Sequence, residues 1–344
     1  MRVVFFGSPP FAVPVFARLS AGEHAPLALV TLPDRPRGRG RQVEPSELVV
    51  LARSHGVSVM QPASPHDPEF LAQLRALAPD VLVVASYGVI LKESLLALAP
   101  HGALNVHASL LPRHRGASPI QAAILAGDPV TGVCVQRMVK ALDEGDVLLA
   151  AERAIGPEET AGELGAALAV LGGETLQRAL DLLAAGRATF TPQDPARATY
   201  ARKIAKEAGH LDFTHPAEEL ARRVRALNPW PVARCLDPRG RELSILRARA
   251  SGTGRLGEPG ELLAAGNGAA PRIACGAGAL ELVEVVPVGK RPMGGADFLR
   301  GVRFEPGARF TTIAAPGSAP GSLPGSPPGS PPGSSAGASS GAAS

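Results

Sequence analysis

The sequence predicts an α/β protein in which a doubly wound, mostly parallel, Rossmann-like sheet is followed by a small OB-like β-barrel. Short apolar runs alternate with amphipathic segments through about the first 190 residues. From about residue 207, short strand-like segments lie between glycine-rich turns. The first pattern is typical of an open parallel sheet and the second of a small barrel. A length of 344 residues suits two domains.

The strands of the first part are predicted from uninterrupted apolar runs, which are typical of parallel strands covered on both faces. The run Val3–Phe6 ends at the turn Gly7-Ser8-Pro9, which marks the first strand end. In chain order the predicted strands are Val3–Phe6, Leu27–Thr31, Val57–Met60, Val81–Ala85, Ala103–His107, Gly132–Met138 and Val147–Arg153. Ligands of such sheets bind at the carboxyl ends of the strands.

Helices are predicted between these strands from apolar residues at helical spacing. Pro14 is tolerated because it lies in the first turn of its helix, and Gly186 suits the position just past the last one. The predicted helices are Phe11–Ser20, Leu48–His55, Pro68–Leu77, Pro119–Ala126 and Glu163–Ala185.

The second part contains one predicted helix, Ala217–Ala226, among short strands. The strands are predicted at Leu211–Phe213, Ala233–Leu236, Leu243–Ala250, Gly260–Leu263, Arg272–Ala274 and Leu280–Val286. The predicted organisation is a catalytic domain over 1–188, a linker over 189–206, a barrel over 207–313 and a tail over 314–344. The tail consists of Pro, Gly, Ser and Ala with a single Leu, so we expect it to be disordered.

Composition excludes several classes of protein. No apolar run approaches the roughly 20 residues that span a bilayer, and the N-terminal run lacks a signal peptide's length and cleavage site. The scattered Cys134, Cys235 and Cys275 argue against a disulfide framework and against structural zinc. We therefore expect a cytoplasmic protein that binds no membrane, and we expect a monomer.

Charge is distributed unevenly along the chain. Residues 1–200 carry a net charge of −2 and residues 201–313 a net charge of +6. The basic second half favours a polyanionic partner, with nucleic acid the first candidate. Ordinary surface solubilisation explains the same charge equally well.

Asn105 and His107 form the sharpest candidate for chemistry. Residues two apart on a strand point to the same face, so an amide donor and an imidazole converge there. Such a pair suits a carbonyl whose oxygen becomes negative during nucleophilic attack. A hydrogen-bonded core histidine is the competing interpretation of His107. Asp143 lies in an acidic turn and could orient His107 and favour its charged form, or belong to an ordinary Asp/Gly turn.

Arginines are concentrated after the second predicted strand, within Pro33–Arg41. Arg35, Arg37, Arg39 and Arg41 are either a clamp for phosphates or a solvated loop. Gly7-Ser8-Pro9 does not match the G-x-G-x-x-G fingerprint, so no nicotinamide cofactor is expected.

Several of these segments resemble the folate-dependent formyltransferase family. Asn105–Pro112 is similar to the family's Asn-x-His-x-Ser-Leu-Leu-Pro core, and Arg115–Ile120 is typical of its subgroup that modifies tRNA. Leu142–Asp146 matches the segment that bears the family's third catalytic residue. His114 stands where Tyr or Trp is usual. Other matching segments are Phe6–Ala12, Pro33–Gly40, Tyr200–Glu207 and Arg225–Pro231. The resemblance covers about residues 1–312.

The resemblance implies the substrates 10-formyltetrahydrofolate and initiator methionyl-tRNA, with no metal. It implies that Asn105, His107 and Asp143 are catalytic, and that Ser109, Leu110, Leu111 and Pro112 lie against the folate. The tRNA would contact Lys203 and Lys206 together with the four arginines of residues 35–41.

Two alternatives remain open. A formyltransferase of the same chemistry could act on a small amine such as glycinamide ribonucleotide or an amino-sugar nucleotide. A noncatalytic RNA-binding protein could be built on a degenerate sheet domain. The basic second half argues against the first, and the Asn105, His107 and Asp143 set argues against the second.

Overall fold

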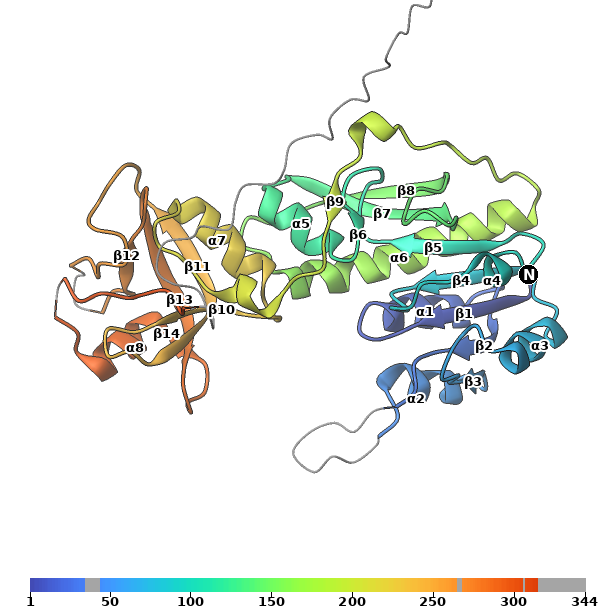
Figure 1. Ribbon diagram of the computed structural model, residues 1–344, viewed down its shortest axis with the longest axis horizontal. Coiled ribbons are helices and arrows are strands. Elements are labelled where there is room, and N and C mark those ends of the chain that lie inside the picture. The colour runs from blue at the N-terminus through green and yellow to red at the C-terminus, as the bar shows by residue number, and fades with distance from the viewer. Residues whose placement is uncertain (35–43, 265–267, 306, 315–344) are drawn as a thin grey trace, which may run out of the picture. The chain divides into compact units, whose positions relative to one another are not determined.

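The computed structural model describes residues 1–34, 44–264, 268–305 and 307–314 (Figure 1). Met1–Ile313 form one compact unit. The predicted clamp residues Arg35, Arg37, Arg39 and Arg41 lie outside the described residues, as does the predicted disordered tail beyond residue 314.

The first part of the chain is a seven-stranded sheet in the order β3-β2-β1-β4-β5-β7-β8. Strands β3, β2, β1, β4 and β5 are parallel, and β7 and β8 continue the sheet antiparallel. The strands are β1 (Val3–Gly7), β2 (Pro26–Val30), β3 (Ser58–Met60), β4 (Val81–Ala85), β5 (Ala103–His107), β7 (Val130–Arg137) and β8 (Val147–Ala154). This mostly parallel sheet is the first half of the predicted fold class.

Helices cover both faces of this sheet (Figure 1). On one face, apolar residues of β1, β4, β5 and β7 pack with α1 and α6 in a single core. On the other face, β1, β2 and β4 pack with α3 and α4. The helices are α1 (Ala12–Ser20), α2 (Glu47–Ser54), α3 (Pro68–Ala76), α4 (Glu93–Leu96), α5 (Pro119–Ala126) and α6 (Ala161–Ala184).

Helix α6 begins at a capping box. The Thr160 hydroxyl accepts a hydrogen bond from the Glu163 amide N–H, and the Glu163 carboxylate accepts from the Thr160 amide N–H. Arg247 also pairs with Glu163. These donors lower the pKa of Glu163 to about 2, with the Thr160 amide the largest contribution. The N-terminus of the longest helix is thereby fixed electrostatically.

The second part is an antiparallel sheet in the order β10-β11-β13-β12, with β14 pairing β13. The strands are β10 (Ala233–Leu236), β11 (Glu242–Ser251), β12 (Arg272–Ala274), β13 (Ala279–Pro287) and β14 (Met293–Gly294), accompanied by helices α7 (Ala217–Ala226) and α8 (Gly295–Val302). The amphipathic helix α7 buries Leu220 and Val224 in this part's own apolar core.

Isolated bridges join the two edges of this sheet. Ile273 of β12 pairs with Leu262, Glu261 pairs with Arg309, and Thr311 pairs with Leu236 of β10. Phe310, between two of these bridges, is almost fully buried in the core. Single bridges thus link the edges of the curled antiparallel sheet, which forms the small β domain that the sequence predicts.

Two predicted strands are wrong. Leu211–Phe213 makes two isolated backbone hydrogen bonds to different partners: the Leu211 N–H donates to the Arg234 carbonyl and the Phe213 carbonyl accepts from the Gly276 N–H, both at 2.9 Å. The Asp212 carboxylate then accepts from the Thr214 N–H at 3.0 Å, which turns the chain toward α7.

The second wrong strand is Gly260–Leu263. Its two central residues pair with different partners, Arg309 and Ile273, so no continuous ladder forms. The prediction also missed α4, α8, β14 and the paired strands β6 (Arg115–Gly116) and β9 (Tyr200–Ala201).

No helix within the described ranges is long and apolar enough to cross a membrane. Cys134, Cys235 and Cys275 are free and buried.

Candidate active site

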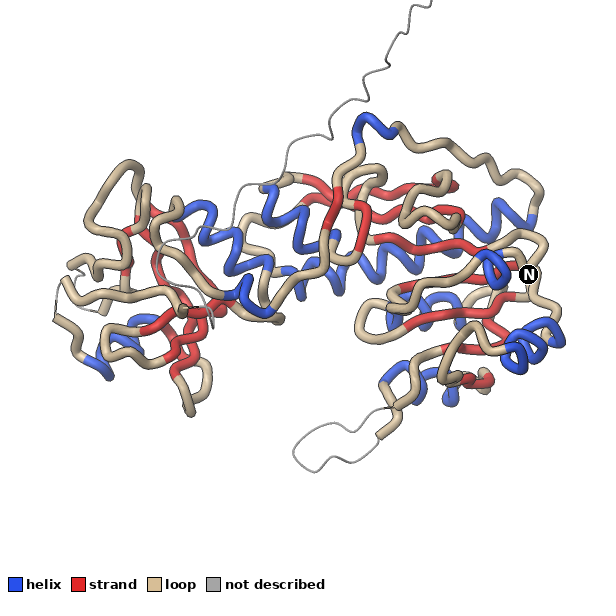
Figure 2. Tube along the Cα trace, in the orientation of Figure 1, coloured by secondary structure: helices blue, strands red, loops and turns tan. Residues whose placement is uncertain are grey.

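One face of β5 and β7 carries polar side chains where the neighbouring strands are apolar. Leu104 and Val106 point into the core beneath α6. Asn105 and His107 therefore point to the opposite face. The antiparallel register places Gln136 beside Asn105 and Cys134 beside His107. The chain between β7 and β8, residues 138–146, is a loop (Figure 2).

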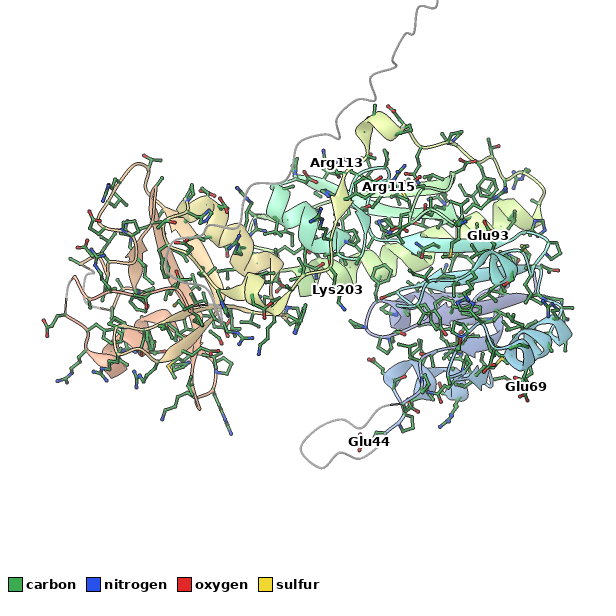
Figure 3. The ribbon with its side chains drawn as sticks, viewed as in Figure 1. Glu44, Glu69, Glu93, Arg113, Arg115 and Lys203 are labelled. Carbon is green, nitrogen blue, oxygen red and sulfur yellow. The ribbon has the colours of Figure 1, made fainter. Side chains whose placement is uncertain are left out.

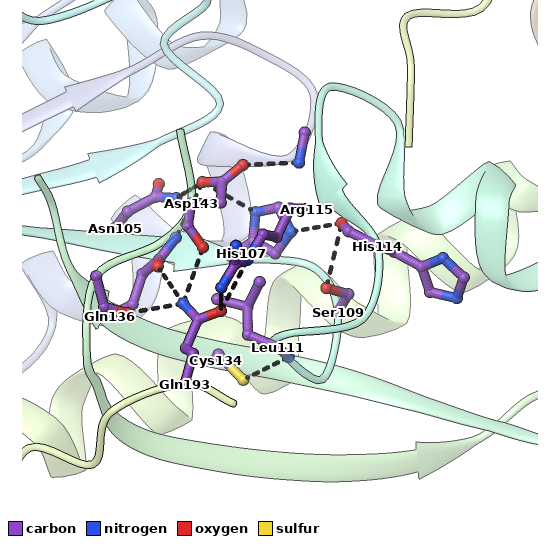
Figure 4. Close-up of polar contacts among 12 residues, drawn as sticks. Asn105, His107, Ser109, Leu111, His114, Arg115, Cys134, Gln136, Asp143 and Gln193 are labelled. Carbon is purple, nitrogen blue, oxygen red and sulfur yellow. Dashed lines mark hydrogen bonds and ion pairs between the residues drawn. The ribbon is translucent and has the colours of Figure 1, made fainter. Parts of the chain in front are cut away.

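Asp143 reaches the polar face from the β7–β8 connection (Figure 4). Its Oδ1 accepts hydrogen bonds from Gln136 Nε2 at 2.9 Å and Asn105 Nδ2 at 3.4 Å. Its Oδ2 accepts from the Gly116 N–H at 2.8 Å. The structure therefore brings Asp143 together with Asn105, and it does so in a left-handed backbone conformation with φ of +54°.

His107 lies between this carboxylate and a carbonyl. Its Nε2 is 3.0 Å from the His114 oxygen, and its Nδ1 is 3.6 Å from Asp143 Oδ1. A carbonyl oxygen only accepts, so Nε2 carries a hydrogen. The second ring nitrogen, Nδ1, faces the Asp143 carboxylate. The side chain of His107 is 6% exposed and that of Asp143 10%.

The loop Ser109–Pro112 follows His107. The Ser109 hydroxyl is fully buried and donates to the Arg113 carbonyl at 2.6 Å, so it shapes the loop rather than facing solvent. The Leu111 N–H donates to Cys134 Sγ at 3.3 Å. Burial raises the pKa of the Cys134 thiol to about 11, which keeps it neutral. Leu110, Leu111 and Pro112 are half-buried and form the part of this loop accessible to a ligand.

His114 holds the end of this loop. Its N–H donates to Thr199 Oγ1 at 2.8 Å, and its Nε2 is 2.7 Å from Asp128 Oδ2. Arg113 donates to the other oxygen of Asp128 at 2.5 Å. His114 is therefore buried and held by Asp128 and Thr199. These contacts fix the position of its carbonyl, which lies against His107.

Three polar residues of the site were missed by the sequence analysis: Arg115, Gln136 and Gln193. Gln136 could have been found, because it follows Cys134 by two on a predicted strand and shares its face. Gln193 lies 50 residues from Asp143, whose carbonyl accepts from its Nε2 at 2.8 Å. No sequence pattern indicates that contact.

Lys203 and Lys206 are exposed on the segment that follows β9, and Lys203 is labelled in Figure 3. The side chains that surround Asn105, His107 and Asp143 do not include either lysine. In the part of the chain that the structure describes, no group of three His, Cys, Asp or Glu side chains is placed to hold a metal ion.

Comparison with known proteins identifies a family. The chain matches formyl transferase over residues 1–180 and the C-terminal domain of formyl transferase over residues 203–303. It is 46% identical over 313 residues to a methionyl-tRNA formyltransferase of Methylobacterium sp. (strain 4-46), covering 90% of this chain and 99% of the relative. It is 47% identical over 310 residues to one of Xanthomonas campestris pv. campestris (strain 8004), covering 90% and 100%.

Solved structures share the fold at low identity. The sugar 3N-formyl transferase WlaRD matches with a TM-score of 0.60 at 13% identity, covering 85% of this chain and 99% of its own. HypX from Aquifex aeolicus, in complex with tetrahydrofolic acid, matches with a TM-score of 0.58 at 19% identity. That match covers 87% of this chain and 47% of HypX.

Proposed function

The chain belongs to the formyl transferase family, and we propose that it is a methionyl-tRNA formyltransferase. It transfers the formyl group of 10-formyltetrahydrofolate to the free α-amino group of methionyl-initiator tRNA. The product, formylmethionyl-tRNA, serves translation initiation. The observation that carries this function is identity of 46–47% along nearly the whole length of relatives with that name.

The polar face of β5 supplies the groups that the transfer needs. Attack of the neutral amine on the formyl carbon places negative charge on the formyl oxygen. We propose that the Asn105 amide and the His107 ring donate hydrogen bonds to that oxygen. One amide hydrogen of Asn105 faces Asp143, which leaves the second for the substrate.

His107 must change partner to take this role. Its Nε2–H donates to the His114 carbonyl, so contact with the formyl oxygen requires that this hydrogen bond be exchanged. Asp143 faces the other ring nitrogen and would stabilise the imidazolium during the exchange. The amine loses a proton and the departing folate nitrogen gains one, which His107 or a water molecule can relay.

The formyl donor is consumed in the reaction, so it is a substrate rather than a resident cofactor. We propose that it lies against Leu110, Leu111 and Pro112, with Ser109 acting through the loop shape. The half-buried apolar side chains of this loop suit contact with the flat ring system of a folate. The hydrogen bond from Leu111 to Cys134 supports this placement, because it anchors the loop to the sheet.

The tRNA is the second substrate, and phosphate contacts supply most of such binding. We propose that Lys203 and Lys206 contact the acceptor stem, since both are exposed on one short segment. The arginines of residues 35–41 are proposed partners on grounds of charge alone. A monomer in the cytoplasm is the expected form of the enzyme.

A formyl-transfer assay tests this function. Purified protein is given 10-formyltetrahydrofolate with methionyl-initiator tRNA, glycinamide ribonucleotide or an amino-sugar nucleotide. We expect transfer to the charged tRNA and none to the small amines. Transfer only to a small amine would assign the enzyme to another branch of the family, and transfer to none would contradict the enzymatic function.

A further inference from the structure

The linker, residues 189–206, touches the turn that carries Asp143. Gln193 donates from Nε2 to the carbonyl oxygens of Asp143 at 2.8 Å and Gly145 at 2.7 Å. The same nitrogen lies 3.3 Å from Gln136 Oε1. The two shorter contacts use both amide hydrogens of Gln193, so this side chain donates only to the turn that contains Asp143 and Gly145.

The other end of the Gln193 amide is held by a buried arginine. Its Oε1 accepts from Arg115 Nε at 3.0 Å and Nη2 at 2.9 Å. The Arg115 side chain is 5% exposed and also pairs with Glu144 at 3.0 Å. Gln193 is therefore fixed at both ends (Figure 4).

A second part of the linker acts on the Asp143 carboxylate indirectly, through strand β6. Strand β9 pairs with β6, matching Tyr200 with Arg115 and Ala201 with Gly116. Gly116 is the residue whose N–H donates to Asp143 Oδ2. The linker thus fixes both the backbone of Asp143 and a donor to its side chain.

The Asp143 turn needs such support. A non-glycine residue with positive φ is uncommon and persists where surrounding contacts hold it. The carboxylate must also stay 3.6 Å from His107 Nδ1, although it comes from a nine-residue connection between two strands. Errors of about 1 Å in such geometry can cost about 100-fold in rate.

We propose that Gln193 is a positioning residue for formyl transfer, acting from the linker on the backbone of Asp143. The inference rests on the proposed function and assigns Gln193 no contact with either substrate. A residue with a general structural role would affect turnover whether or not Asp143 is present. Gln193 is expected to affect turnover only when Asp143 is present, because it acts by holding that residue in place.

The experiment measures kcat and both KM values for Gln193→Ala and Gln193→Glu. The glutamate is isosteric and keeps the acceptor for Arg115, but it removes both donors to the acidic turn. We expect kcat to fall about 10–100-fold in each variant, with both KM values within about twofold of the wild type. Asp194→Ala is the matched control, because Asp194 lies beside Gln193 and its carboxylate, among the described residues, accepts a hydrogen bond only from the Ala196 N–H. Its kcat should be unchanged.

A double-mutant comparison separates positioning from general stability. In an Asp143→Ala background, Gln193→Ala should lower kcat no further, because the group that it positions is gone. The same fold-loss in both backgrounds would overturn the proposal, as would a kcat of Gln193→Glu equal to that of the wild type. A wild-type protein without transferase activity would instead contradict the proposed function.

Discussion

Replacing Asp143 by asparagine tests whether transfer requires a carboxylate at this position. The carboxylate accepts from Gln136, Asn105 and Gly116 and faces His107. Asparagine has one acceptor oxygen and one NH2 group. Whichever way the amide is turned, its nitrogen faces a group that donates in the native protein.

The cost follows from that mismatch. With the amide nitrogen toward Gly116, one buried N–H loses its acceptor, which costs about 1–3 kcal/mol. If the activation free energy of transfer rises by a similar amount, the rate falls about 10–100-fold. Loss of the negative charge beside His107 adds to this, since positioned acid–base groups contribute about 100-fold or more. We expect kcat of Asp143→Asn to fall about 10³–10⁴-fold.

The assay is single-turnover formyl transfer at saturating concentrations of both substrates. Asp146→Asn is the control, because it makes the same chemical change in the same connection. A rate for Asp143→Asn within threefold of the wild type would refute the reasoning. An equal loss in Asp146→Asn would show that the loop, and not the acid, matters.

Three further predictions concern other parts of the molecule. In Gly116→Ala the new Cβ would lie 2.7 Å from a backbone oxygen at φ of +109°, so we expect lower kcat and a lower unfolding midpoint, measured by transfer assay and urea titration. Glu163→Gln should destabilise the fold at pH 7 by about 1 kcal/mol, since the lowered pKa would give about 3 kcal/mol before screening of this half-exposed side chain. That contribution exists above the unfolded pKa and disappears as the pH falls from about 4.5 toward about 2, so urea midpoints of variant and wild type should converge there. Replacing Lys203 and Lys206 together by Ala should weaken tRNA binding and flatten its dependence on salt, with folate KM unchanged; an unchanged salt slope in a filter-binding titration would contradict the assignment.

The sequence predicts the sheet well because its strands are continuous apolar runs. The bounds of β4 and β5 are those predicted, and the shared face of Asn105 and His107 follows from strand periodicity alone. The barrel strands β10 and β12 are also as predicted. In these elements the local pattern and the tertiary environment agree.

The parts that sequence could not supply depend on contacts between distant loops. Gln193 meets the acidic turn only because the linker runs back across it. The positive φ of Asp143 and the carbonyl of His114 against His107 also depend on tertiary packing. The segment Gly260–Leu263 resembles a strand locally, but its pairing is divided between two partners. Local propensity does not contain that information.

The single-turnover rates of Asn105→Ala and His107→Ala decide whether the polar face of β5 performs the transfer. Each variant should keep the wild-type unfolding midpoint within a few degrees or a few tenths molar urea and should bind both substrates. Each should lose about 100- to 1000-fold in rate, the usual cost of removing a donor to a developing oxyanion. Transfer at close to the wild-type rate in either folded variant would show that the replaced side chain does not stabilise the transition state.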